Sequence, residues 1–180
     1  AVFGVGCKLD DIVNKFSQGI MLALSPFVGQ NIAAGKTERV KKGVLWSWFY
    51  CGAFYAVFTV IYIIYSRQMF GLFTDDRNVV EQAPVFVSAI IWGFPAMAVL
   101  RGSGGMVQGI GNAKMSMILG ILDGFLFRIL LSYLFGIVMH MQLYGFVLGY
   151  GLACYAHAIP STIYFLSGKW KKRKSLVEDI

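Results

Sequence analysis

The chain has 180 residues, of which 57% are hydrophobic and only 14% are charged, whereas soluble domains average about 25% charged residues. This composition excludes a single large soluble core. The net charge of +7 comes from basic residues that flank long apolar segments rather than forming one basic face, which argues against nucleic acid as a partner.

Apolar length and turn signals predict five membrane spans, near residues 12–34, 44–65, 82–110, 115–138 and 143–166. A span needs about 20 predominantly apolar residues, and 44–65 contains no charged residue at all. We therefore expect an all-α, polytopic membrane helix bundle. It would form one helical lobe over residues 1–168, followed by a basic cytoplasmic tail over 169–180.

Polar residues gather at the start of the first predicted span. Asp10 and Asn14 are four residues apart, as are Asp11 and Lys15, so each pair lies along one side of a helix. This side, with Asp11, Asn14 and Gln18 as candidate residues, forms either the outer wall of a solute pathway or a span end that reaches into the lipid headgroups.

The segment 28–43 closes the first span and opens the second. Gln30 and Asn31 place polar side chains at the membrane edge, and Gly35 can adopt the left-handed conformation that ends a helix. Arg39 follows at the membrane surface. The pattern is typical of a helical hairpin loop.

Prolines and glycines inside the spans indicate a packed bundle rather than plain anchors. Pro26, Pro95 and Pro160 each remove a backbone hydrogen bond that neighbouring groups must replace. Glycines crowd the end of the third span and allow close backbone approach or local unwinding; they are Gly102, Gly104, Gly105, Gly109 and Gly111.

Asp123 lies well inside the fourth span, where an unpaired carboxylate is expensive. Arg128 follows five residues later, about 140° around an α-helix, and is poorly placed to pair with it. Arg101, in the third span, is the expected partner. Either these charges face a water-filled cavity, or they form buried ties that fix the helix register.

Other chemistry has little support in the sequence. Cys7, Cys51 and Cys154 are scattered singly, without metal-ligand spacing. No nucleophile, base and orienting group occur at usable spacing. We therefore expect no enzyme, no catalytic residues and no metal site.

Basic residues set an expected orientation. They follow the first, third and last spans, namely Lys36, Arg39, Lys41, Lys42, Lys114, Lys169, Lys171, Lys172, Arg173 and Lys174. Cytoplasmic loops are enriched in Lys and Arg, so the carboxy terminus is expected in the cytoplasm and the amino terminus outside. No preceding span would carry that terminus across, so we expect the chain to begin part-way through a larger protein. Three tryptophans near span ends, Trp46, Trp48 and Trp170, are interpreted as interfacial anchors.

The segment 28–43 resembles a loop that recurs in each half of the multidrug and toxic compound extrusion (MATE) family. There, a small-residue span ends in a Gly-Gln-Asn-like element, here Gly29, Gln30 and Asn31. A glycine, here Gly35, a cation and a basic helix start follow. Four further segments are similar to the family's external connection, inner glycine turn, Arg-containing fourth element and cytoplasmic ending; they are 69–76, 107–112, 127–131 and 168–172.

The resemblance, which covers nearly the whole chain, implies a specific role. Family members have twelve spans in two six-helix lobes and export cationic or amphipathic compounds from the cell in exchange for sodium ions or protons. This chain looks like part of the carboxy-terminal lobe. Its implied partners are the lipid bilayer of the plasma membrane, small organic cations, and a first lobe and seventh span outside this sequence, and its only implied cofactor is the coupling ion.

The resemblance leaves the coupling group open. No family coupling carboxylate is retained here, so Asp123 is a substitute on physical grounds. Two other readings remain at this point, a membrane scaffold or assembly subunit that transports nothing, and an exporter of a lipid-linked sugar with the same architecture.

Overall fold

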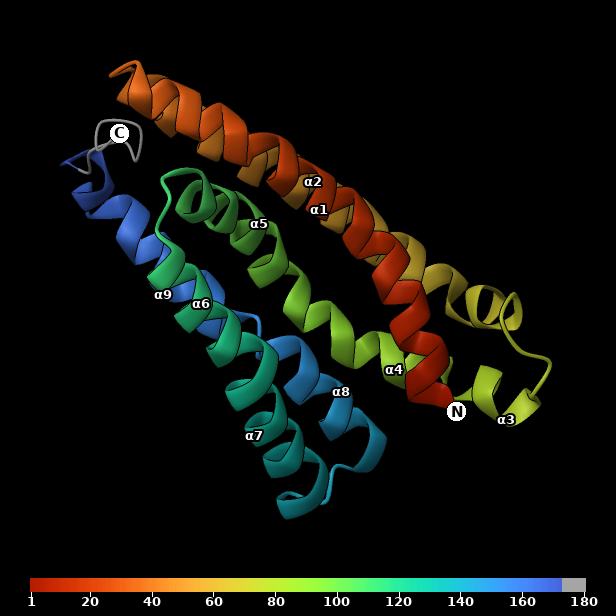
Figure 1. Cartoon of the computed structure of the whole chain (residues 1–180). Coiled ribbons are helices and arrows are strands. Elements are labelled where there is room, and N and C mark those ends of the chain that lie inside the picture. The colour runs from red at the N-terminus through yellow and green to blue at the C-terminus, as the bar shows by residue number, and fades with distance from the viewer. Residues whose placement is uncertain (173–180) are drawn as a thin grey trace.

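A computed structural model of the chain describes residues 1–172, and every regular element in that range is a helix (Figure 1). The elements are α1 (Val2–Ala33), α2 (Thr37–Gly71), α3 (Arg77–Glu81), α4 (Ala83–Ile90), η1 (Ile91–Gly93), α5 (Phe94–Gly109), α6 (Ala113–Ile121), η2 (Leu122–Phe127), α7 (Arg128–Tyr133), η3 (Leu134–Val138), α8 (Gln142–Leu152), α9 (Tyr155–Leu166) and η4 (Lys169–Lys172). The predicted all-α membrane bundle is confirmed.

Four helical runs are long and apolar enough to cross a membrane, namely Thr37–Gly71, Ala83–Gly109, Ala113–Val138 and Gln142–Leu166. They match four of the five predicted spans. The span predicted over 12–34 is instead a helix that already begins at Val2, and it is not one of the four. Polar residues such as Gln18, Gln30 and Asn31 lower its hydropathy, although its 32 residues exceed the length that a span requires.

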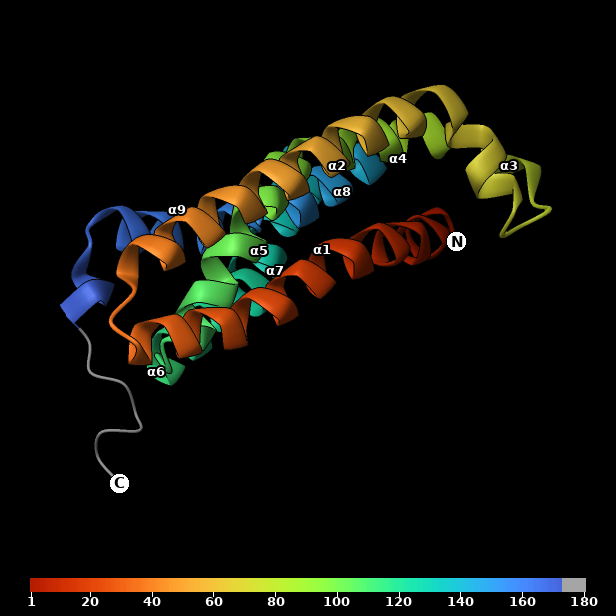
Figure 2. The same ribbon diagram turned by 90° about the horizontal axis from the view of Figure 1, so that it is seen from above.

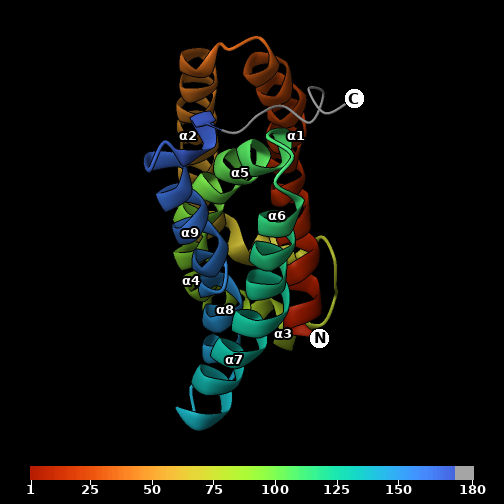
Figure 3. The ribbon, with the colours of Figure 1, turned by 60° about the vertical axis from the view of Figure 1, so that its left-hand side comes forward.

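The bundle is organised around α5. The antiparallel helices α1 and α2 both pack on α5, and α9 packs on it from the other side (Figure 3). The α7–α8 pair extends the bundle, with α8 packed against α4. Because neighbours surround α5, most of its residues from Phe94 to Val107 are buried.

Glycines allow α5 to approach α1 closely. A Cβ atom on Gly105 would lie 2.9 Å from the Met21 carbonyl oxygen, and one on Gly109 would overlap the Ser25 carbonyl oxygen. At these two positions the predicted close backbone approach is confirmed.

Glycines also end two of the helices. Gly35 and Gly111 have φ values of 68° and 72°, in the region that glycine adopts most readily. After Gly35, the Lys36 N–H donates to the Asn31 carbonyl at 2.8 Å, which closes a Schellman-type turn. The prediction that Gly35 ends a helix is confirmed.

The three span prolines differ in their local roles. Pro26 and Pro160 lie inside α1 and α9. Pro95 lies in the first turn of α5, directly after the 3₁₀ turn η1. In a first turn its missing N–H removes no hydrogen bond within the α-helix.

The three basic segments lie at one end of the bundle, where the α1–α2 loop and the start of α6 approach η4, while α3 lies at the opposite end (Figure 2). Lys171 Nζ lies 2.9 Å from Glu38 Oε1 at this end. The tail predicted over 169–180 is therefore docked at its start, and residues 173–180 lie outside the described residues.

Trp170 anchors η4 to the protein. It is 1% exposed, its Nε1–H donates to the Phe165 carbonyl at 2.8 Å, and its ring stacks on the Phe165 ring. The interpretation of Trp170 as a membrane-interface anchor is therefore wrong. The chain turns back at Gly168, which has a φ of 66°, and buries the indole against α9.

Candidate functional site

A polar cavity of about 180 Å³ lies between the apolar helices. Its lining comes from α1, α5, the η2–α7 region and the α8–α9 region, and consists of Asp10, Asp11, Asn14, Lys15, Gln18, Met97, Leu100, Arg101, Asp123, Arg128, Tyr150 and Cys154. All six predicted pathway residues, Asp11, Asn14, Gln18, Arg101, Asp123 and Arg128, belong to this one cavity.

The acid that α1 buries in the cavity is Asp10, at 1% exposure, whereas the neighbouring Asp11 is exposed. Asn14 Nδ2 donates to Asp10 Oδ2 at 2.9 Å, as their spacing of four residues predicts. Asp10 was not among the predicted site residues. The signal that singles it out is this pairing with Asn14.

Asn14 joins three helices through one amide oxygen. Its Oδ1 accepts from the Tyr55 hydroxyl of α2 at 2.9 Å and from Arg101 Nη2 of α5 at 3.3 Å. The Tyr55 hydroxyl also lies 2.8 Å from Ser17 Oγ. Asn14 therefore links the Asp10 carboxylate to Tyr55 of α2 and Arg101 of α5.

Two buried polar atoms of this network have no protein partner in the described part of the chain. They are Asp10 Oδ1 and Arg101 Nε. A buried acceptor without a donor is uncommon in folded proteins. Asp10 Oδ1 is therefore a buried acceptor at the cavity wall without a donor among the described residues.

Asp123 pairs with Arg128, at 3.2 Å between Oδ1 and Nη2. The predicted pairing of Asp123 with Arg101 is wrong, and so is the expectation that Asp123 and Arg128 are badly placed. Both expectations assumed an α-helix. Residues Leu122–Phe127 instead form a π-helical turn, whose i→i+5 hydrogen bonding aligns residues five apart.

Arg128 has two further neighbours that the sequence did not indicate. Its guanidinium lies 4.2 Å from the centre of the Tyr150 ring, and Nη2 lies 3.9 Å from Cys154 Sγ. Stacking on an aromatic face stabilises a cation. No local pattern predicts these contacts, because Tyr150 and Cys154 come from α8 and from the break that follows it.

The cavity lining is electrically balanced. Three carboxylates, on Asp10, Asp11 and Asp123, face three cations, on Lys15, Arg101 and Arg128. Within residues 1–172, no cluster of His, Cys, Asp or Glu is arranged to hold a metal ion.

The predicted loop motif lies outside the cavity. Asn31 Nδ2 donates to the Phe27 carbonyl at 2.8 Å, and a Cβ atom on Gly29 would lie 3.1 Å from the Gly109 carbonyl oxygen. Gln30 is exposed. In this structure the motif closes α1 and fits it against the end of α5.

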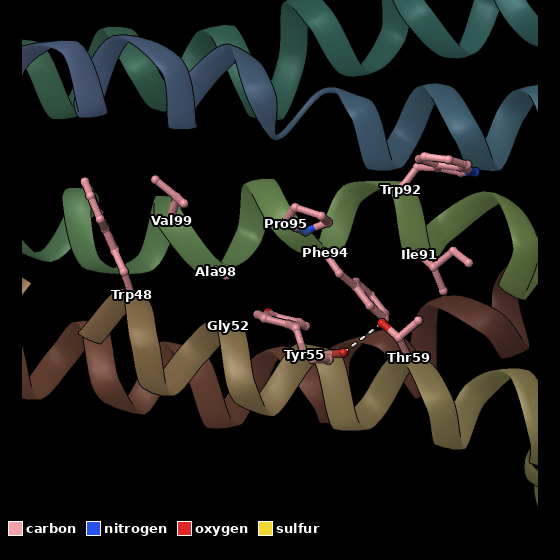
Figure 4. Close-up of a pocket in the computed structure, with 11 residues that line it drawn as sticks. Trp48, Gly52, Tyr55, Thr59, Ile91, Trp92, Phe94, Pro95, Ala98 and Val99 are labelled. Atoms are coloured by element: carbon pink, nitrogen blue, oxygen red, sulfur yellow. Dashed lines mark hydrogen bonds between the residues drawn. The ribbon is translucent and has the colours of Figure 1, made fainter. Parts of the chain in front are cut away.

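A second hollow, an apolar groove of about 520 Å³, runs between α2 on one side and η1 and α5 on the other (Figure 4). Its lining includes Trp48, Tyr55, Trp92, Phe94 and Pro95. The Tyr55 ring lines this groove while its hydroxyl reaches Asn14 in the polar cavity. Tyr55 thus separates an aromatic groove from a charged cavity.

Comparison with known proteins gives a consistent result. The model of the MatE family matches residues 1–134. The chain is 22% identical over 177 residues to the probable multidrug resistance protein NorM of Thermotoga maritima, covering 97% of this chain and 38% of that protein.

Two further relatives are the multidrug resistance protein MdtK of Klebsiella pneumoniae and the FAD transporter of Shewanella oneidensis. MdtK is 27% identical over 120 residues, which cover 67% of this chain and 26% of MdtK. The FAD transporter is 25% identical over 87 residues, which cover 48% of this chain and 19% of that protein. The chain spans well under half the length of each relative, and no solved structure matches it significantly.

Proposed function

The chain belongs to the MatE family, and from this premise we propose that it forms part of a secondary antiporter that exports cationic or amphipathic compounds in exchange for sodium ions or protons. The family is one of transporters, in agreement with the resemblance of the loop motifs. The observation that carries the antiport proposal is the polar cavity, which gathers buried and half-buried charges between apolar helices. Ionisable groups inside a membrane bundle mark ion pathways by default.

In this proposal the coupling ion binds at Asp10. The carboxylate has one oxygen held by Asn14 and one free of protein partners among residues 1–172. A proton or sodium ion on the free oxygen neutralises the acid and weakens its attraction for the Asn14 amide. Asn14 also holds Tyr55 and Arg101, so ion occupancy alters the contacts between α1, α2 and α5.

Alternating access requires the ion to favour one conformation over the other. The α1–α5 interface is packed closely through glycines, and in this proposal it is the interface that separates in the second conformation. An occupied Asp10 would favour one packing of these helices, and an ionised Asp10 the other. Rocking of lobes about a central site then moves the cargo.

The proposed cargo is an organic cation with an apolar body. Two relatives carry multidrug resistance in their names, and the aromatic groove beside Tyr55 offers apolar surface next to a charged cavity. Because one relative is an FAD transporter, FAD is the second substrate to be tested beside the organic cation. We place the protein in the plasma membrane with its basic end in the cytoplasm, because positive loops favour that side.

The test is ion-driven efflux by the native-length protein in inverted membrane vesicles. Sodium and proton gradients are applied separately, and transport of ethidium is compared with transport of FAD. Asp10→Asn should reduce gradient-driven ethidium transport at least tenfold, whereas Asp75→Asn, which changes an exposed acid outside the cavity, should change it less than twofold. Equal losses in both variants, or transport that needs neither gradient, would contradict the assignment to Asp10.

A further inference from the structure

A third hollow, which the proposed transport does not use, lies between α1 and α2 near the basic end of the bundle. This α1–α2 groove has a volume of about 340 Å³ and is lined by Ile20, Ala23, Leu24, Phe27, Gly43, Trp46, Ser47 and Tyr50. Its walls are almost entirely apolar. At Gly43 the two helices come close, because a Cβ atom there would lie 2.7 Å from the Phe27 ring.

Two aromatic side chains form the α2 wall of the groove. Trp46 and Tyr50 are 56% and 57% exposed, and their rings stack with centroids 5.7 Å apart. They are the tenth and fourteenth residues of α2, which begins at Thr37 directly after the basic loop. Trp and Tyr at the end of a span favour the level of the lipid headgroups and the first acyl carbons.

Cations continue the same face of α2 toward the membrane surface. Arg39 precedes Gly43 by four residues and Trp46 by seven, so it shares their side of the helix. Lys42 precedes Trp46 by four residues and flanks this side. Arg39 and Lys42 are exposed, and neither forms a salt bridge with any residue of the described chain.

The one acid of this turn is engaged elsewhere. Glu38 pairs with Lys171 at 2.9 Å, on the side of α2 that faces η4. The mouth of the groove keeps a net positive charge, because Arg39 and Lys42 outnumber Glu38, which lies one turn before Lys42 and already pairs with Lys171. Positive groups at this depth attract the phosphates of anionic lipids.

We propose that the α1–α2 groove binds one anionic phospholipid, with an acyl chain along the α1 wall, beside Trp46 and Tyr50, and the phosphate between Arg39 and Lys42. An apolar trough with two unpaired cations at its headgroup end matches the two chemically distinct parts of that molecule. A zwitterionic lipid fills the trough equally well but gains less from the cations. A helix of a protein partner would leave the cations without counter-charges unless it carried acids at that depth.

Lipid binding can be measured through the fluorescence of Trp46. The native-length protein in detergent is titrated with phosphatidylglycerol brominated on its acyl chains, and the Trp46 signal is the difference between wild-type and Trp46→Phe fluorescence. Brominated phosphatidylcholine serves as the neutral comparison, and inorganic phosphate is added to separate a lipid site from a simple anion site. We expect saturable quenching by phosphatidylglycerol at lower concentration than by phosphatidylcholine, unaffected by millimolar phosphate.

Single substitutions distinguish the contribution of the lipid headgroup to binding from that of the acyl chain. Arg39→Gln and Lys42→Gln should each weaken phosphatidylglycerol binding about fivefold, the effect of one cation near a charged lipid, while leaving phosphatidylcholine unchanged. Ala23→Phe, which fills the groove from α1, should weaken both lipids. Lys114→Gln removes an exposed cation of the same end of the bundle, away from the groove, and should change neither.

Three results would overturn the proposal. They are equal affinity for the two lipids, displacement of phosphatidylglycerol by free phosphate, and the absence of saturable quenching because protein covers the groove. Each variant is first compared with wild type by size-exclusion chromatography, so that loss of folding is not read as loss of binding. The result is independent of efflux, and either proposal can fail without the other.

Discussion

Asp123 and Arg128 form an ion pair at 3.2 Å across five residues of a single helix. The π-helical turn Leu122–Phe127 makes this possible, because it places residues five apart on one side. Their side chains are 17% and 27% exposed, so the pair is a mostly buried part of the cavity wall. The same turn lets Arg128 stack on Tyr150.

Asp123→Asn should therefore destabilise the protein by about 1–3 kcal/mol, because it leaves a largely buried guanidinium without its counter-charge. Gradient-driven efflux should fall as well. Asp75→Asn, an exposed acid of the loop before α3, is the matched control and should be neutral. Thermal unfolding in detergent and vesicle efflux measure the two effects. Wild-type stability of Asp123→Asn would mean that the pair contributes nothing to the fold.

Tyr55→Phe tests the junction at Asn14. It keeps the ring in the apolar groove and removes the hydroxyl that donates to Asn14 Oδ1 at 2.9 Å. We expect a loss of about 1 kcal/mol, typical of one hydrogen bond, and slower efflux at an unchanged expression level. Tyr50→Phe removes the hydroxyl of an exposed tyrosine of α2 and should have no effect on unfolding. Identical behaviour of the two variants would rule out a role for the Tyr55 hydroxyl.

Gly109→Ala tests the approach of α5 to α1. An added Cβ atom would overlap the Ser25 carbonyl oxygen and press on Val28, and such overpacking costs about 1–3 kcal/mol. Gly120→Ala is expected to change the free energy of unfolding in the opposite direction. Nothing lies within 4 Å of a Cβ atom there, so the better helix propensity of alanine should stabilise by about 0.5–1 kcal/mol. Chemical denaturation of both variants checks the signs, and two stabilising substitutions would refute the packing argument.

Gly35→Ala should destabilise the α1–α2 turn by about 1–2 kcal/mol. Gly35 has a φ of 68°, and a residue that carries a side chain is strained in that left-handed region. Gly35→Asn should lose less, since asparagine tolerates the left-handed conformation better. Gly4→Ala, in open space on α1, is the control. We expect the unfolding midpoint to be highest for wild type, lower for Gly35→Asn and lowest for Gly35→Ala. A Gly35→Ala variant as stable as wild type would contradict this argument.

Trp170→Ala and Lys171→Gln compare the contributions of side-chain packing and of an ion pair to the attachment of η4. Removing the buried indole, which stacks on Phe165 and donates to its carbonyl, should cost about 3–5 kcal/mol. Breaking the exposed pair between Lys171 and Glu38 should cost less than about 1 kcal/mol. Susceptibility of the carboxy-terminal end to trypsin should rise in the first variant only. A larger effect of Lys171→Gln would reverse this ranking.

Local sequence patterns predicted much of the architecture. Four spans follow from apolar length alone, since a helix that satisfies its own backbone is what an apolar segment forms in lipid. Gly35 marked the end of α1 because only its lack of a side chain suits that conformation. The pathway residues Asp11, Asn14, Gln18, Arg101, Asp123 and Arg128 stood out because they are polar groups within or beside apolar segments, and they do meet in one cavity.

Pairing within that cavity could not be predicted in the same way. The angle between Asp123 and Arg128 was calculated for an α-helix, and the π-helical turn changed it. Asp10 and Asp11 are adjacent and chemically alike, and only the packing of α1 against its neighbours buries the first and exposes the second. Trp170 similarly looks like an interfacial residue until the turn at Gly168 folds it under Phe165.

The sequence by itself determined the class of the protein, four of its spans and the residues with unusual charge, because membrane insertion depends on the polarity of each segment taken alone. The tertiary structure decided which charge faces which. It placed Asn14 among Asp10, Tyr55 and Arg101, and it set Arg128 against Asp123 and Tyr150. These contacts join residues from different helices or depend on a local change of helical pitch, and both arise only when the helices pack.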